Sequence, residues 1–152
     1  MNNEELKQTI LSILPSAVFE ENTQFLTIQI PADQIHDFAK KIKESETISF
    51  DYLFCLTGID YGDSLGVIYH LRSTKYRHEI VVKIKTSDRE TPAVDTVCDI
   101  YKTAEFHERE IFDLFGIKFN HHPDLRRILL DESWEGHPLR KDYIDEVNIV
   151  ER

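Results

Sequence analysis

Histidines and acidic residues in the last third of the chain are the side chains whose types and spacing could carry out chemistry. His107 and Glu108 begin like the helix of a zinc protease, but Ile111 stands where that motif requires its second histidine. His121 and His122 lie in the tail, and a metal site that includes them would require the tail to fold back on itself. A metal-dependent hydrolase built on these residues is an alternative, but the favoured interpretation is that the histidines form hydrogen bonds or an interface. We predict no metal site.

Other motifs of catalytic and cofactor sites are missing from the sequence. Without a Cys-x-x-Cys pair, this chain alone is not expected to hold an iron–sulfur cluster or a zinc knuckle. Gly58, Gly62 and Gly66 are evenly spaced, but no helix or Lys-Ser/Thr pair follows them to bind phosphate. Cys55 and Cys98 lie far apart in apolar surroundings and are expected to be buried, reduced thiols. We therefore predict neither catalytic nor cofactor-binding residues in this chain.

Length and charge limit the class of protein. The chain has 152 residues and a net charge of −10, from 18 Lys and Arg against 28 Asp and Glu, which suits one acidic domain. Such a surface argues against nucleic acid and anionic lipid as direct partners, because both attract basic surfaces. No apolar run approaches the roughly 18 residues that cross a bilayer. The polar first residues resemble neither a signal peptide nor a transit peptide, so we expect the protein to stay in the cytoplasm.

Hydrophobic periodicity predicts a helix, a strand, a helix, three strands and a final helical region, in that order. Pro15 ends the first helix, and Pro31 opens the second. Strands are expected at 24–30, 48–57, 66–73 and 78–85, with a weaker one at 17–20, a loop at 58–66 and the last helical region at 92–115. The strand at 48–57 has apolar residues on both faces and is expected at the centre of the sheet. We predict the α+β class: a two-layer domain with helices packed on a mixed, mostly antiparallel sheet.

The helix expected at 104–115 carries unusual charge. Helical spacing places Glu108 beside Phe115, within the apolar face. Arg109 and Asp113 fall on the far side, where they form either an ordinary surface ion pair or part of an interface. We expect the helix to be covered on one side by its own sheet and on the other by a partner.

Glu108 needs a buried donor, because an unpaired carboxylate inside an apolar face is costly. Neighbours on the same helix supply no cation on this face, since Arg109 points about 100° away. A partner must come from the sheet, from the returning tail, which we favour, or from an adjacent subunit, and the candidates within the tail are Arg126, Arg127, Arg140 and Lys141. We expect one of these arginines to pair with Glu108.

After Gly116 the helical period disappears. The remaining segment, 152 minus 116, is 36 residues long, and structureless stretches beyond roughly 15 residues are uncommon inside compact domains. It holds two His-Pro pairs and a tryptophan but no long apolar run, with one short turn expected at 124–129. We predict a domain at 1–116 and an extended C-terminal arm at 117–152 that docks on a partner subunit.

Three motifs run in order from the helix through the arm. They are Glu108-Arg109-Glu110 with Asp113 and Phe115-Gly116-Ile117, then His122 to Leu129, and then Glu135 to Asp142. Together they resemble the C-type subunit of the proton-pumping NADH:quinone oxidoreductase, respiratory complex I, also called the 30 kDa subunit. Gly58 to Tyr61 and Tyr69 to Leu71 extend the resemblance to the N-terminal half, while Leu130 and Ile144 depart from the family pattern.

The resemblance implies a non-catalytic, cofactor-free subunit in the hydrophilic arm of a bacterial-type complex. Flavin, iron–sulfur clusters and quinone are expected in partner subunits, chiefly beside the large quinone-site subunit, on which the C-terminal segment is expected to lie. This chain would then support electron transfer coupled to proton translocation. It would be peripheral on the cytoplasmic side of the bacterial inner membrane and reach the membrane only through the complex.

Three alternatives remain open: the equivalent subunit of an energy-converting hydrogenase, the metal hydrolase described above, and a stand-alone binding module. Under the favoured interpretation the important residues are structural or form the interface with the partner. The predicted set is Glu108, Arg109, Glu110, Asp113, Gly116, His122, Pro123, Asp124, Arg126, Arg127, Trp134, Gly136, His137, Pro138, Arg140 and Asp142.

Overall fold

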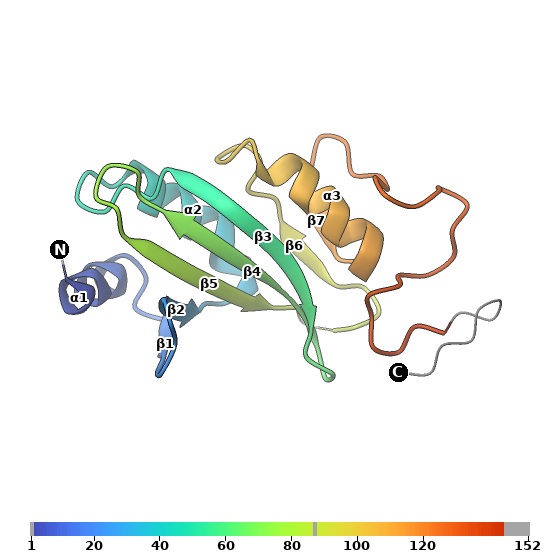
Figure 1. Ribbon diagram of the computed structural model, residues 1–152, viewed down its shortest axis with the longest axis horizontal. Coiled ribbons are helices and arrows are strands. Elements are labelled where there is room, and N and C mark those ends of the chain that lie inside the picture. Colours follow the sequence, from blue (N-terminus) through green and yellow to red (C-terminus); the bar gives the residue numbers. More distant parts are fainter. Residues whose placement is uncertain (1, 87, 145–152) are drawn as a thin grey trace.

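The computed structural model describes residues 2–86 and 88–144. Figure 1 shows a twisted sheet with α2 behind it, α3 beside β3, and the last described residues forming a long loop next to α3. The helices are α1 (Asn3–Ile13), the short 3-10 helix η1 (Ala32–Gln34), α2 (Ile35–Glu44) and α3 (Ala104–Phe115). The strands are β1 (Val18–Glu20), β2 (Leu26–Gln29), β3 (Tyr52–Asp60), β4 (Leu65–Arg72), β5 (Glu79–Lys85), β6 (Ala93–Asp95) and β7 (Lys118–Asn120).

Five strands form one sheet in the order β1-β2-β5-β4-β3, and β6 and β7 form a second, two-stranded sheet. Within the larger sheet only β2 and β5 run parallel, and the other neighbours are antiparallel. The predicted mixed, mostly antiparallel sheet is therefore confirmed, as is the weaker strand near 17–20. None of the described helices is both long and apolar enough to cross a bilayer.

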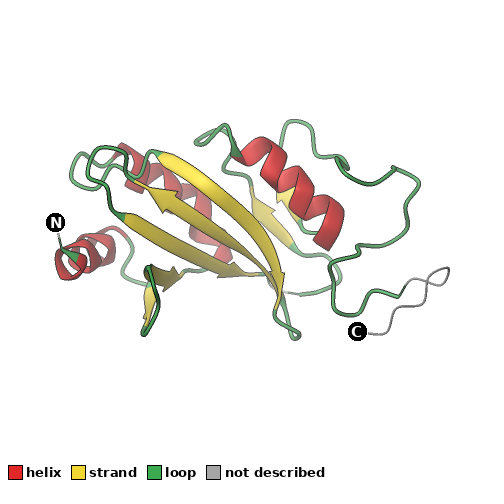
Figure 2. Ribbon diagram, viewed as in Figure 1, coloured by secondary structure: helices red, strands yellow, loops and turns green. Residues whose placement is uncertain are grey.

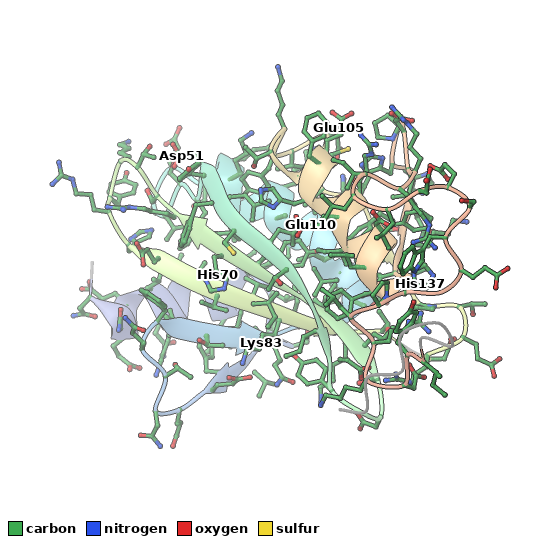
Figure 3. The ribbon with its side chains drawn as sticks, turned by 45° about the vertical axis from the view of Figure 1, so that its right-hand side comes forward. Asp51, His70, Lys83, Glu105, Glu110 and His137 are labelled. Atoms are coloured by element: carbon green, nitrogen blue, oxygen red, sulfur yellow. The ribbon has the colours of Figure 1, made fainter. Side chains whose placement is uncertain are left out.

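One face of the large sheet is buried under helices, and the other is more exposed, although Thr27 and Val81 on that face are also buried. On β4, Val67, Tyr69 and Leu71 are buried, while Ile68 and His70 between them are half-buried. Figure 3 labels His70 on this strand. Strands with one buried face alternate in this way. The inner side chains join those of α1, α2 and α3 in one core, which confirms the predicted two-layer α+β class.

The prediction of a central strand at 48–57 was wrong, because β3 is the edge of the sheet. The register shifts between Leu53 and Cys55, so that Leu53 and Leu56 are both buried although their spacing is odd. A bulge of this kind breaks simple alternation and mimics a strand covered on both faces. Tyr52 and Phe54 remain exposed. The loop predicted at 58–66 is also shorter, because β3 continues to Asp60 and β4 begins at Leu65.

The sequence predicted a helical region that begins at residue 92, but residues 92–103 are not helical. The first part of this region forms β6, which pairs in parallel with β7. The residues after β6 form turns that lead into α3. Each of these strands has only three residues, which is too short for a periodic pattern to show in the sequence. Ile117 and Phe119 are buried in the core, so the folded part extends past the boundary predicted at 116.

Gly58 marks the closest approach of β3 to α3. A Cβ atom at this position would lie 2.6 Å from Cδ2 of Phe115. The absence of a side chain therefore lets the end of α3 pack directly on the edge strand.

We predict that Gly58→Ala lowers the free energy of unfolding by about 1–3 kcal/mol, as expected for overpacking in a dense core. Urea denaturation of the purified chain measures this loss. Thr57→Val, an isosteric change at the exposed neighbouring position, is the control and should change stability by less than about 0.5 kcal/mol. Equal losses in the two variants would show that the Gly58–Phe115 contact is not the cause.

Candidate functional site

Helix α3 is covered on both sides, as predicted, but its own chain supplies much of the cover on the far side. Ile111 and Phe115 face the core. Arg109 and Asp113 are also buried, with 6% and 0% of their surface exposed. The residues that cover them belong to the segment 121–144, the described part of the predicted arm that follows β7, and from here on the arm means this segment. Figure 2 draws the arm as a continuous loop beside α3.

Asp113 is the centre of the contact between α3 and the arm. Its Oδ1 accepts a hydrogen bond from Nη1 of Arg127 at 2.8 Å. Its Oδ2 accepts from three consecutive backbone N–H groups, those of Ile128, Leu129 and Leu130, at 3.1, 2.7 and 2.9 Å. Burial alone would raise the pKa of Asp113, but these four donors hold the pKa below its ordinary value. The carboxylate therefore determines the turn of the arm at 127–130.

Arg127 extends this contact along the arm. Its Nη2 donates to the backbone carbonyls of Trp134 and Gly136 at 3.1 and 2.9 Å. Arg109 donates from Nε and Nη2 to the carbonyls of Arg126 and Arg127 at 3.2 and 3.1 Å. An Arg109–Asp113 surface ion pair was one of two predicted possibilities, but each residue instead binds the arm.

The C-terminal end of α3 binds the arm a second time. Gly116 ends the helix with a left-handed φ of 75°, and a Cβ there would lie 2.5 Å from Cδ2 of His137. His137 contacts the carbonyl of Asp113 through Nδ1 at 2.9 Å, and Arg140 donates from Nε to the carbonyl of Phe115 at 2.6 Å. The carbonyls at the end of a helix lack partners within the helix and attract cations. The arm supplies those partners, and Figure 3 labels His137 at this place.

A further contact, which no pattern in the sequence predicted, holds the end of the arm. Asp60 at the end of β3 is bound by both terminal nitrogens of Arg89, at 2.6 and 2.8 Å. The backbone N–H of Lys141 donates to Asp60 at 2.9 Å, and Arg89 also pairs with Asp142 at 3.3 Å. The hydrogen bonds from Arg89 are the largest cause that holds the pKa of Asp60 far below its usual range. Asp60 belonged to a family motif in the sequence, but nothing singled out Arg89.

Glu108 does not pair with an arginine of the arm, which corrects the prediction. Its side chain is fully buried and accepts hydrogen bonds from Thr96 Oγ1 at 2.5 Å and from the backbone N–H of Val97 at 2.9 Å. Burial raises the pKa of Glu108 to about 7, and these two donors only partly oppose the shift. The arm runs over the side of Asp113, and five helical residues place Glu108 about 140° away from Asp113.

The structure also locates the remaining predicted residues. Arg126 pairs with Asp124 at 3.0 Å near solvent, so only Arg127 of the two adjacent arginines points inward. Trp134 is 40% exposed, and Glu110 is exposed on α3. The other predicted residues in the arm turn its backbone or line its surface: Gly136 with a φ of 83°, Pro123 at a cleft, and half-buried Pro138.

Metal-ligating atoms come together at one place in the described part of the chain. One ligand atom each from Cys98, Glu108 and His122 lies within 4.8 Å of the others. Cys55 and Cys98 are both half-buried free thiols, so the prediction that they are buried was wrong. Of the four residues proposed for a metal hydrolase, the group includes Glu108 and His122, but not His107 or His121.

We predict that Asp113→Asn lowers the free energy of unfolding by about 2–4 kcal/mol, because Arg127 and up to three N–H groups lose a charged partner. Hydrogen exchange at Ile128, Leu129 and Leu130 should become faster, while exchange in the sheet core changes less. Glu110→Gln removes an exposed carboxylate from the same helix and is the matched control. Unchanged exchange at these three amides would show that Asp113 does not hold the arm.

Stability should also fall in acid through Asp60 and Asp113. Both have a folded-state pKa below the ordinary value of 3.8, so in acid the unfolded chain takes up protons before the folded chain does. Their stabilisation is complete above about pH 5 and is lost as the pH falls below 3.8 towards the folded-state values. Urea denaturation between pH 7 and pH 3 measures this slope. Asp113→Asn should reduce the slope, and an unchanged slope would contradict the assignment.

Comparison with known proteins gives consistent matches. Residues 28–147 match the family described as "Respiratory-chain NADH dehydrogenase, 30 Kd subunit". The C-type subunit of the NADH-quinone oxidoreductase of Roseiflexus castenholzii is 37% identical over 147 residues, which cover 93% of this chain and 84% of that protein. The C/D-type subunit of Phocaeicola vulgatus is 47% identical over 122 residues, which cover 80% of this chain but only 23% of that longer protein.

A solved structure supports the same relationship. A chain of the membrane-bound sulfane sulfur reductase, an archaeal respiratory membrane complex, superposes with a TM-score of 0.80 at 30% identity. The superposition covers 95% of this chain and 86% of that one. The resemblance deduced from the motifs is thereby confirmed: the chain belongs to the family of the 30 kDa subunit of respiratory-chain NADH dehydrogenases.

Proposed function

We propose that this chain is the C-type subunit of an NADH:quinone oxidoreductase complex, with no catalytic site of its own. It contributes to the hydrophilic arm of the complex and supports the large quinone-site subunit in electron transfer coupled to proton translocation. Flavin, iron–sulfur clusters and quinone belong to partner subunits. The chain is peripheral on the cytoplasmic side of a bacterial inner membrane. The names of the relatives support the assignment to the complex.

The main structural observation in favour of this proposal is the surface of the chain's own arm, residues 121–144. Its polar groups bind its own domain and Leu125 packs against the core, whereas most of its other large apolar side chains are left outside. These exposed side chains are Ile128, Leu129, Trp134, Leu139 and Ile144, which expose 39, 64, 40, 46 and 79% of their surface. None of residues 121–144 is buried. An arm with a preformed backbone conformation and exposed apolar anchors binds a partner at a low entropic cost.

The fused relative supports the choice of partner. The protein of Phocaeicola vulgatus is named as a C/D-type subunit, and this chain matches 23% of its length. Joining two subunits in one polypeptide raises their effective concentration and suits neighbours that bind each other. We therefore propose the D-type subunit as the surface on which the arm lies. The net charge of −10 permits this association where that surface is basic.

The equivalent subunit of a related membrane complex, such as an energy-converting hydrogenase, is the second candidate. The observation in its favour is the superposition on a chain of the sulfane sulfur reductase complex, which is not named as an NADH dehydrogenase. Affinity purification of the tagged chain from native membranes separates the two candidates. Recovery of an NADH-oxidising module supports the first, and recovery of hydrogenase subunits without that module supports the second.

We predict that Trp134→Ala weakens assembly by roughly 2 kcal/mol, a loss of about thirtyfold in affinity, because a partly exposed tryptophan is a typical interface anchor. Binding of the purified chain to the rest of the complex measures the effect. Tyr76→Ala is the matched control, since Tyr76 is 41% exposed but lies in the turn between β4 and β5, away from the arm. Equal effects of the two substitutions would contradict docking through the arm.

A further inference from the structure

The loop after β6, helix α3 and the start of the arm meet at one group of potential metal ligands. Cys98 follows β6, Glu108 lies on α3 and His122 lies at the start of the arm. Their ligand atoms lie within 4.8 Å of one another. Zinc bonds of about 2.0–2.3 Å at tetrahedral angles require separations of roughly 3.5 Å, so modest side-chain rotations would close the group around an ion.

We propose that Cys98, Glu108 and His122 form a binding site for a divalent zinc-type cation. One thiolate, one carboxylate and one imidazole suit zinc, and three protein ligands leave a fourth position open. The proposal concerns the isolated chain and does not depend on assembly into a complex.

The hydrogen bonds around these side chains are those expected of an outer shell. The carboxylate of Glu108 is oriented by Thr96 Oγ1 and by the N–H of Val97. The N–H of Cys98 donates to the same Thr96 oxygen at 3.1 Å, so the loop and the carboxylate form one bonded unit. Ligating carboxylates are usually held in this way by second partners.

His122 has a tautomer that suits a ligand. Its Nε2 lies 2.9 Å from the carbonyl of Glu105, so this nitrogen carries the proton and donates it. Its Nδ1 therefore has a lone pair, which accepts from the N–H of Asp124 at 3.0 Å. Metal-bound histidines commonly donate their second N–H to a carbonyl. Metal binding through Nδ1 would replace the contact with Asp124, which is an exposed residue.

The local charge also favours a cation. Glu108 is fully buried and forms no ion pair among the described residues. The buried hydroxyl of Tyr69 has no hydrogen-bond partner within the described chain, and burial followed by the charge of Glu108 raises its pKa. A divalent cation would compensate the negative charge that this region otherwise disfavours.

An open cleft gives an ion access to the group. Cys98 lines this cleft, which has a volume of about 950 Å³. His36, Asp99 and His121 line the same cleft. One of these side chains or a water molecule can supply the fourth ligand. A bound ion would join the loop, α3 and His122, and so fix the first residues of the arm on the domain.

Competition between the chain and a chromophoric zinc chelator tests the site, with the purified chain first freed of metal by EDTA. We expect one zinc ion per chain. Cobalt substitution should give the thiolate-to-cobalt charge-transfer absorption, which Cys98→Ser abolishes and His122→Ala weakens. Cys55→Ser is the matched control, because Cys55 is the other half-buried free thiol and lies on β3, outside the group.

Alkylation of the two thiols provides a second readout that needs no substitution. With free zinc at ten times its dissociation constant, alkylation of Cys98 by a maleimide should slow roughly tenfold, by mass action. Alkylation of Cys55 should not change. Absence of stoichiometric binding, charge-transfer absorption that survives in Cys98→Ser, or equal protection of both thiols would each overturn the proposal.

Discussion

The buried carboxylate of Asp113 is the interaction on which the described structure of the arm depends. It receives the guanidinium of Arg127 and three consecutive backbone N–H groups, and it is wholly removed from solvent. A buried carboxylate without such donors would be costly, and the arm without this acceptor would have three N–H groups less well satisfied. Helix and arm therefore require each other, although the arm contains no residue that is itself buried. Because most of its anchors are polar, the arm leaves Trp134 and several apolar side chains exposed, and these are the proposed contacts with a partner.

Two carboxylates on the same helix have opposite environments and different uses. Asp113 is surrounded by donors from the arm, and its pKa is lowered. Glu108 has only Thr96 and Val97, and burial raises its pKa to about 7. Asp113 is a structural carboxylate whose charge is already balanced by hydrogen-bond donors of the arm. Glu108 lies buried without an ion pair among the described residues, beside a thiol and an imidazole, and this placement motivates the proposed cation site.

Much of the fold could be predicted from the sequence where long periodic patterns decide the structure. The stripes of α1 and α2 and the alternation along β4 and β5 specify which faces are buried, because side-chain direction follows directly from helical or strand spacing. The edge position of β3 and the pairing of β6 with β7 were not predictable. A bulge at Leu53 and Cys55 disturbs the alternation, and two strands of three residues carry too little pattern.

The sequence by itself determined the family, the class of fold and the presence of an arm that begins near the end of α3. Ordered motifs and one-dimensional periodicity are enough for these. Only the tertiary structure decided which charges meet: Arg127 binds Asp113, Arg89 binds Asp60, and Glu108 lies beside Cys98 and His122. Such pairs are separated by 10 to 29 residues and are chosen by the path of the backbone in space. Helical spacing shows only the direction in which Glu108 or Asp113 points, and the tertiary fold determines which residues that side chain contacts.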